Sequence, residues 1–181
     1  MRHRNGARAD ADGGWKDIIE DFTEEFFEFY FPEVHGAVDF AQAPEFLDTE
    51  LRQIMPEAVG ARRHVDRLVK VVLRSGGEQW LYVHVEVQGE TGEPPEQFAE
   101  RMYVYNYRLC DRYGKSVVSL AVLADGDAGY RPTEYRRELL GNVLSFRFPA
   151  AKLLDLDADK LAASGKAFAL VTRIQLAYTQ V

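Results

Sequence analysis

The chain has 181 residues, of which 46% are hydrophobic, 12% aromatic and 28% charged, and its formal net charge at pH 7 is −7. These proportions are typical of a soluble globular protein, and the length suits one domain with a proper core. No apolar run approaches the roughly 20 residues of a membrane-spanning helix, so we expect no membrane association. The acidic balance argues mildly against non-specific binding to nucleic acid.

Residues 1–14 contain basic side chains but no apolar stretch, so they are predicted to be a disordered leader rather than a signal peptide. We therefore expect a cytoplasmic protein with a single domain over residues 15–181. The run from Ala167 to Val181 is amphipathic and has no capping signal, which leaves open a chain truncated at its C-terminus.

Helical spacing predicts two helices before the first strand. The first covers residues 15–33 and is expected to end at Pro32, and the second covers residues 43–55 with Pro44 in its first turn. Their apolar positions are Ile18, Phe22, Phe26 and Phe29 in the first helix and Phe46, Leu47, Leu51 and Ile54 in the second.

Further elements are predicted after the middle of the chain. A helix over residues 98–114 ends at Gly114, and an aliphatic run over residues 116–125 has the pattern of a strand covered on both faces. Helices are also predicted near residues 135–140 and from Ala167 onward. This order predicts an α/β fold with a mixed β-sheet flanked by helices.

Two alternating segments, residues 64–73 and 79–88, flank a Ser-Gly-Gly segment and predict a β-hairpin. Because side chains alternate along a strand, Glu86 and Gln88 share the face opposite to the valines. A loop of three residues would place Asp66 opposite Glu86, and a loop of five would place it opposite Gln88. A two-residue Gly-Gly loop would instead put the two carboxylates on opposite faces.

Carboxylates that face each other in a sheet repel, so the pair calls for a cation. Oxygen ligands from carboxylates suit Mg²⁺, and Gln88 could orient the attacking water or a phosphate oxygen. The alternative is that both acids are ordinary solvated residues, with Asp66 paired to Arg62, Arg63 or Arg67. His84 shares the polar face and is interpreted as a histidine at the edge of the core rather than a general base.

The spacing of Asp66, Glu86 and Gln88, written D-x19-E-x-Q, resembles the PD-(D/E)XK phosphodiesterase core of the Rpn-like (YhgA-like) recombination-promoting nucleases, also called PD-(D/E)XK nuclease family transposases. Several blocks resemble that family in the same order, from about Trp15 to Ala169. They are WKDIIEDF, PEFLDTEL, RHVDRLVKV, HVEVQGE, FAERMYVYNYRLCDRYG and SLAVLADGD.

The resemblance implies a PD-(D/E)XK restriction-endonuclease-like core of the αβββαβ type and cleavage of DNA that depends on Mg²⁺, with Mn²⁺ as a substitute. It implies that Asp66, Glu86 and the backbone carbonyl of Val87 bind the metal. A helical glutamate often completes such a site, and Glu50 is our candidate, with Glu45 as the alternative. Gln88 stands where the general motif has a lysine, so the site lacks that positive charge and slower chemistry is expected.

The helix that follows the hairpin carries a basic and aromatic stripe. Arg101, Tyr105, Arg108 and Arg112 recur at helical spacing, which suits contacts with phosphates. The alternative is that Tyr105 belongs to the core and the arginines are solvated or paired with acids.

Two functions follow from these observations. The first is a metal-dependent endonuclease that acts on double-stranded DNA and is linked to DNA recombination or transposition, with a homodimer left open. The second is a non-catalytic interaction module that keeps the nuclease fold, which the acidic net charge and Gln88 would favour.

Overall fold

The computed structural model describes residues 15–55, 64–86, 93–163 and 165–179. The predicted leader lies outside these residues. A helix over residues 15–21 comes first. The later helices are α2 (Thr23–Tyr30), α3 (Pro32–Ala37), α4 (Asp48–Ile54), α5 (Pro95–Tyr113), the short 3-10 helix η2 (Leu153–Asp155), α6 (Ala158–Ala163) and α7 (Ala167–Thr179). The strands are β1 (Glu45–Phe46), β2 (His64–Val72), β3 (Glu78–Glu86), β4 (Val117–Leu123), β5 (Glu134–Leu139), β6 (Asn142–Arg147) and β7 (Ala150–Lys152).

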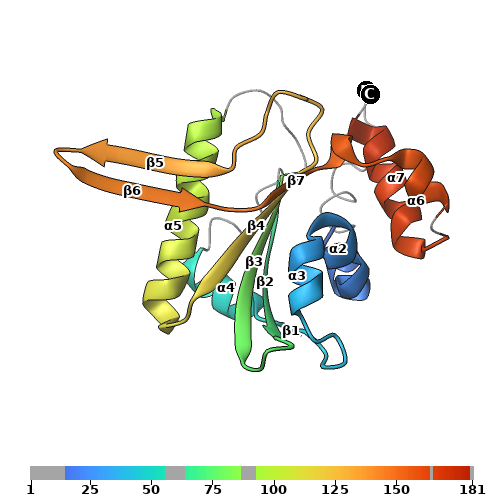
Figure 1. Ribbon diagram of the computed structural model, residues 1–181, viewed down its shortest axis with the longest axis horizontal. Helices are drawn as coiled ribbons and strands as arrows, with labels where there is room; N and C mark the ends of the chain where they lie inside the picture. Colours follow the sequence, from blue (N-terminus) through green and yellow to red (C-terminus); the bar gives the residue numbers. More distant parts are fainter. Residues whose placement is uncertain (1–14, 56–63, 87–92, 164, 180–181) are drawn as a thin grey trace, which may run out of the picture.

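Five strands form one mixed sheet in the order β1-β2-β3-β4-β7 (Figure 1). The pairs β1/β2 and β2/β3 are antiparallel, whereas β3/β4 and β4/β7 are parallel. The parallel step from β3 to β4 needs a long crossover, and α5 provides it. The predicted α/β class, a mixed sheet flanked by helices, is confirmed.

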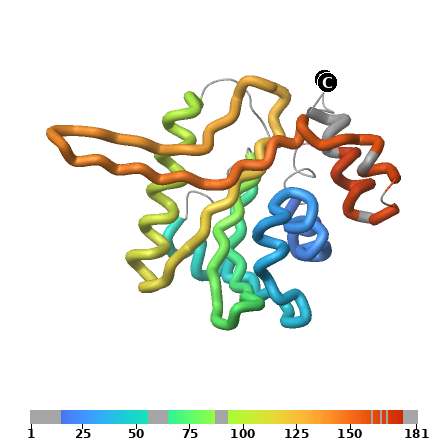
Figure 2. The backbone as a smooth tube through the Cα atoms, viewed as in Figure 1, coloured from blue at the N-terminus to red at the C-terminus, as the bar shows by residue number. Residues whose placement is uncertain are grey.

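Helices cover both faces of the sheet (Figures 1 and 2). Valines of β2 and β3 such as Val69 and Val83 face α2, α3 and α7 in one core, together with Phe26 and Phe168. The opposite face packs against α4 and α5 in a second core, built on residues that include Leu68, Tyr82, Phe98, Met102 and Leu109. Burial on both faces explains why β4 reads as an almost continuous apolar run.

The N-terminal helical region differs from the prediction in its boundaries. A turn at Phe22 divides it, α2 ends at Tyr30, and Pro32 is the first residue of α3 rather than the end of a helix. Proline fits a first helical position because that position needs no backbone donor.

The second predicted helix begins later than expected. Glu45 and Phe46 form β1 and pair with Lys70 and Val69 of β2, so α4 starts only at Asp48. Tertiary pairing here overrides the helical spacing of the sequence.

The elements after the hairpin follow the sequence more closely. The predicted helix over residues 98–114 is α5, and it ends at Gly114 in a left-handed conformation with φ of 59°. The predicted strand over residues 116–125 is β4, and the helix expected from Ala167 is α7.

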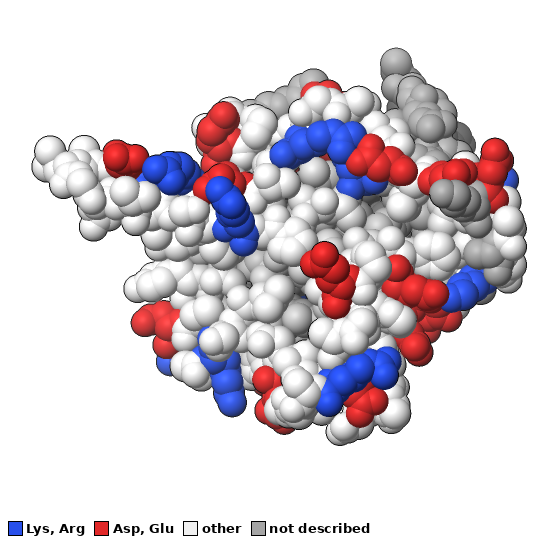
Figure 3. Space-filling model, viewed as in Figure 1, with Lys and Arg blue, Asp and Glu red and all other residues white. Residues whose placement is uncertain are grey.

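The prediction of a helix near residues 135–140 is wrong, because this segment is strand β5. It pairs with β6 in a two-stranded arm that extends past α5 (Figure 1). Tyr135 stacks on Tyr103 of α5 with ring centroids 5.3 Å apart, and Phe146 approaches the same ring at 5.7 Å. Pairing and this aromatic packing outweigh the helical tendency of the sequence. Figure 3 shows charges of both signs along the arm and none at its end.

Over the residues described, the structure contains no helix whose length and apolar character would allow it to cross a membrane.

Candidate functional site

The β2/β3 pairing places Asp66 opposite His84 and His64 opposite Glu86. Both predicted registers are therefore wrong, by two and four residues. The turn lies earlier than expected, because Val72 pairs with Glu78 and the Leu73 N–H donates to the Gly77 carbonyl. Since both shifts are even, Asp66 and Glu86 still share one face, the one covered by α5.

His84 lies between the two carboxylates. Its Nδ1 is 2.8 Å from Oδ1 of Asp66, and its Nε2 is 3.3 Å from Oε2 of Glu86. The imidazole is fully buried, and the ring of Phe98 from α5 packs edge-on against it at 5.3 Å. The histidine that the sequence placed at the edge of the core is thus the group that joins the two acids.

Tyr82 and Arg101 also contact these acids. The Tyr82 hydroxyl donates to Oδ1 of Asp66 at 2.5 Å. Arg101, near the start of α5, donates through Nη2 to Glu86 at 3.3 Å and to Glu93 at 2.7 Å. Asp66 and Glu86 are only 7% and 8% exposed, so these donors replace much of the water that a carboxylate needs.

The neighbouring charges shift the pKa values of His84 and Tyr82, the two side chains that contact Asp66. Burial by itself lowers the pKa of His84, but the charge and hydrogen bond of Asp66 and the hydrogen bond of Glu86 outweigh it, so the pKa is raised. An imidazole in its protonated form donates from both ring nitrogens, which suits a position between two carboxylates. Burial and the Asp66 charge also raise the pKa of Tyr82 well above its usual value, which keeps its hydroxyl protonated.

A second buried ion pair lies near Glu86, at the carboxyl ends of the parallel strands β4 and β7. Lys152 at the end of β7 donates to Oδ1 of Asp125 at 2.5 Å, and the Asp127 N–H donates to the same oxygen at 3.0 Å. Asp125 follows β4, where the Ala124 N–H donates to the Glu86 carbonyl at 2.9 Å. This pair was not predicted, although Asp125 comes shortly after the aliphatic strand, and an acid in that position is a recognisable signal.

Gln88 and Val87, predicted to orient water and to bind metal, lie outside the described residues. Glu50 is described but does not join Asp66 and Glu86. Its carbonyl accepts a hydrogen bond from Tyr113, whose ring packs against Trp80 at the other end of β3. Trp80 is six residues from Glu86, which in a strand is about 20 Å.

The alternative glutamate also lies at that far end of the hairpin. Glu45 forms an ion pair with Lys70, which in turn pairs with Trp80 across the ladder. The structure therefore brings together Asp66 and Glu86 but neither candidate for the helical glutamate.

The predicted stripe on α5 divides between core and surface. Tyr105 is 7% exposed and its ring packs edge-on against Tyr82, so it belongs to the core and cannot form part of a phosphate-binding surface. Arg108 is exposed, whereas the guanidinium of Arg101 binds Glu86 and Glu93. Arg67, once a possible partner of Asp66, points to the other face and binds Glu20 at 2.8 Å.

The oxygen atoms of Asp66 and Glu86 suit a divalent cation but are only part of the ligands that such an ion needs. Asp66 and Glu86 supply hard oxygen atoms, and the mutual repulsion of two buried carboxylates is relieved by any cation between them. His84 now occupies that position, and the described residues contain no group of three or more His, Cys, Asp or Glu side chains arranged to hold a metal ion. Asp66 and Glu86 thus fit as two ligands of a site that needs at least one more.

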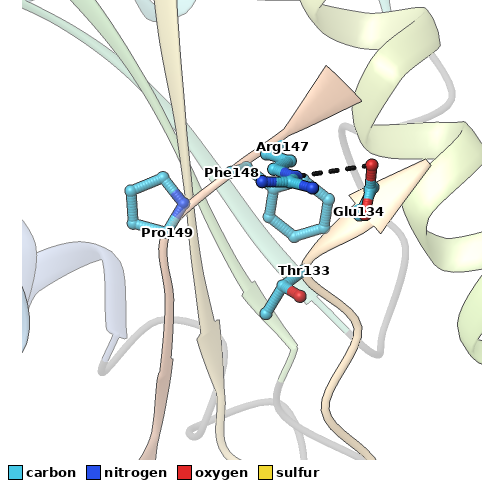
Figure 4. Close-up of a pocket in the computed structure, with 5 residues that line it drawn as sticks. All are labelled: Thr133, Glu134, Arg147, Phe148 and Pro149. Carbon is cyan, nitrogen blue, oxygen red and sulfur yellow. Dashed lines mark ion pairs between the residues drawn. The ribbon is translucent and has the colours of Figure 1, made fainter. Parts of the chain in front are cut away.

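A separate depression lies at the base of the β5–β6 arm, and neither Asp66 nor Glu86 lines it (Figure 4). It is lined by Thr133, Glu134, Arg147, Phe148 and Pro149. Glu134 and Arg147 form an ion pair across it at 3.4 Å.

Comparisons of the chain with protein-family models, with curated proteins and with solved structures found no significant match.

Proposed function

We propose that the chain is a metal-dependent DNA endonuclease, a hydrolase of phosphodiester bonds that acts in DNA recombination or transposition. One observation carries the proposal: Asp66 and Glu86, from adjacent antiparallel strands, lie buried on one face and converge on His84. Two acids are rarely buried side by side without a chemical task. The link to recombination rests on the resemblance described above.

The order of elements around the acids supports the same proposal. Strands β2 and β3 are antiparallel, α5 follows, and β4 returns parallel to β3. This matches the latter part of the αβββαβ order that the resemblance implies. It places Glu86 beside Leu123 at the end of β4.

Asp66 and Glu86 would hold Mg²⁺ or Mn²⁺, which when bound activates water and stabilises charge on the phosphoryl group. The residues of the chain have their own parts. His84 fixes the side chains of both acids, and Arg101 holds Glu86 from the side of α5. In the reaction a water oxygen forms a bond to phosphorus, the P–O ester bond breaks, and the leaving oxygen takes up a proton.

The test is cleavage of supercoiled plasmid with Mg²⁺ or Mn²⁺. Asp66→Asn and Glu86→Gln keep the size of each side chain, and each is expected to abolish cleavage, as is EDTA. Asp155→Asn is the matched control, because Asp155 is exposed and pairs with Arg131 outside the site. Wild-type rates in Asp66→Asn or Glu86→Gln would refute the assignment of the site.

One feature favours a second candidate, a non-catalytic interaction module that keeps this fold. His84, Tyr82 and Arg101 already supply donors to both acids without a metal. A calorimetric titration separates the two candidates: Mg²⁺ or Mn²⁺ binding that is lost in Glu86→Gln supports the nuclease. A folded wild-type protein that neither binds these ions nor cleaves DNA would support the module.

A further inference from the structure

The β5–β6 arm has two outer edges that differ in charge. Among the described residues, β5 and β6 pair only with each other, so the outer edge of each strand has no partner strand there. Strand β5 contains four charged residues, Glu134, Arg136, Arg137 and Glu138, whereas β6 contains one, Arg147 at its base. Charged side chains protect an edge strand from pairing with another chain. The edge of β5 has this protection, and most of the edge of β6 lacks it.

The hydrogen bonds of the arm show which backbone groups of β6 point outward. The Phe148 N–H donates to the Thr133 carbonyl at 3.0 Å, so these two residues are a hydrogen-bonded pair. Bonded and non-bonded pairs alternate along an antiparallel ladder, which makes the pair Arg136/Ser145, three steps further, a non-bonded one. The backbone N–H and C=O of Ser145, and those of Val143 two residues away, therefore point away from β5 and toward the outer edge.

The side chains along this edge are exposed or half-buried, and none between Asn142 and Phe146 is charged. Val143 is 52% exposed, and Ser145 is exposed as well. Leu144 and Phe146 alternate with them, are half-buried, and lie on the face toward α5. An exposed strand with apolar side chains and outward backbone groups is the kind of edge to which a further strand adds.

A second copy of β6 fits this edge, because β6 is complementary to itself. When two β6 strands pair antiparallel about Leu144, that residue lies opposite its own copy, and Val143 lies opposite Ser145 of the second copy. Both members of the Val143/Ser145 pair have outward backbone groups, so they can exchange hydrogen bonds. Arg147 lies opposite Gly141 of the second copy, so no charged side chain faces another.

Two further observations favour this register and this strand. Within the described residues, the outer edge of β6 is open only as far as Arg147, because the Pro149 carbonyl accepts a hydrogen bond from the Ala121 N–H of β4 at 3.0 Å. The register described above stays within that limit. In the two registers that overlap most of β5, about Arg136 or Arg137, an arginine would instead lie opposite its own copy, and like charges in that position repel.

We propose that two copies of this chain form a symmetric dimer by pairing their β6 strands antiparallel, so that the two arms become one four-stranded sheet. The assembly closes at two copies, because the same edge is used on both sides and the outer strands are then the charged β5 strands. The dimer needs neither DNA nor a metal ion, so it stands or falls independently of the nuclease function.

The test is the mass of the full chain in solution, measured by sedimentation equilibrium over a series of protein concentrations. We expect the mass to rise from 20.6 kDa toward twice that value and no further. Ser145→Pro removes an outward N–H and leaves the hydrogen bonds to β5 in place, and an edge strand tolerates proline at such a position. Each dimer then loses two hydrogen bonds of about 1 kcal/mol, so the dissociation constant should rise roughly 30-fold.

Arg136→Pro is the matched control. It removes an outward N–H at the residue that pairs with Ser145, but on the edge of β5, so the dimer should persist. Val143→Lys is a second test that leaves every backbone group in place, and it gives the β6 edge the kind of charge that protects the β5 edge. It should weaken the dimer as well. Protection of the Leu144 amide, which bonds to β5, from hydrogen exchange shows that the arm stays folded in each variant.

Three results would overturn the proposal. The first is a wild-type mass that stays at the monomer value at every concentration, which would leave the β6 edge to a strand of another protein, or a mass that grows beyond two copies. The second is a dimer that both Ser145→Pro and Val143→Lys leave at wild-type strength. The third is an equal loss in Arg136→Pro and Ser145→Pro, which would assign the contact to the arm as a whole rather than to the β6 edge.

Discussion

Two side chains of the neighbouring strand form hydrogen bonds with Asp66. His84 and Tyr82 both contact its Oδ1, and all three side chains are buried. A buried carboxylate that loses a donor keeps its desolvation cost without compensation, and hydrogen bonds to charged groups are worth about 1.5–3 kcal/mol. The stability of the metal-free site should therefore depend on single hydroxyl groups.

Tyr82→Phe tests this dependence. The ring still packs against Tyr105, so the loss of the hydroxyl is the main change, and the free energy of unfolding is expected to fall by about 1.5–3 kcal/mol. Urea unfolding in EDTA measures it. Tyr135→Phe is the control: its hydroxyl donates to the exposed Glu100 at 3.1 Å, so its loss should cost less than about 1 kcal/mol. Equal losses in the two variants would contradict the argument.

At the level of elements, the β5–β6 arm turns through two residues with positive φ. Leu140 has φ of 50° and Gly141 has φ of 81°, as a two-residue hairpin turn requires. Glycine adopts this conformation freely, but for leucine it costs roughly 1–2 kcal/mol. Leu140 is also 99% exposed, so no packing offsets that cost.

Leu140→Asn should therefore stabilise the arm, because asparagine tolerates positive φ and Asn-Gly is the preferred pair in such turns. We expect slower hydrogen exchange of the β5 and β6 amides, by up to about fivefold for a gain of roughly 1 kcal/mol. Leu139→Asn is the control, since Leu139 is exposed but lies within the strand. Faster or unchanged exchange in Leu140→Asn would show that the arm does not depend on its turn.

The hairpins also show how far the sequence could predict the fold. With a loop of three or five residues, the alternation of side chains predicted Asp66 and Glu86 on one face, and the structure places them so, although both faces of β3 are buried. The alternation could not set the register, because two adjacent glycines permit turns of several lengths, and both Gly76 and Gly77 adopt φ near 90° in the turn that forms. Strand β5 was mistaken for a helix because its contacts with Tyr103 come from a distant segment.

Over the whole molecule, the parallel pairs β3/β4 and β4/β7 bring together the carboxyl ends of three strands, where Glu86 of the candidate site lies. Asp66 and Glu86 could be connected from the sequence because one short turn joins their strands. Asp125 and Lys152 reach the same edge only through the β3/β4 and β4/β7 pairs, and local patterns contain no information on those pairs. The role of His84 was missed for a related reason, since it depends on the register.

The two cores meet at a single sheet, so they should unfold together. Trp15 is buried in the core with α2 and α7, and Trp80 packs at the edge of the core with α5; these are the two tryptophans of the chain. Trp15→Phe leaves the fluorescence of Trp80, which reports on the α5 face, and Trp80→Phe leaves that of Trp15, which reports on the other face.

Because β2, β3 and β4 contribute side chains to both cores, neither face can lose its packing while the other keeps its strands. Each variant should therefore show one urea transition by fluorescence that coincides with its own transition by circular dichroism. Transitions that separate within either variant would mean that the helices of one face leave the sheet before it unfolds.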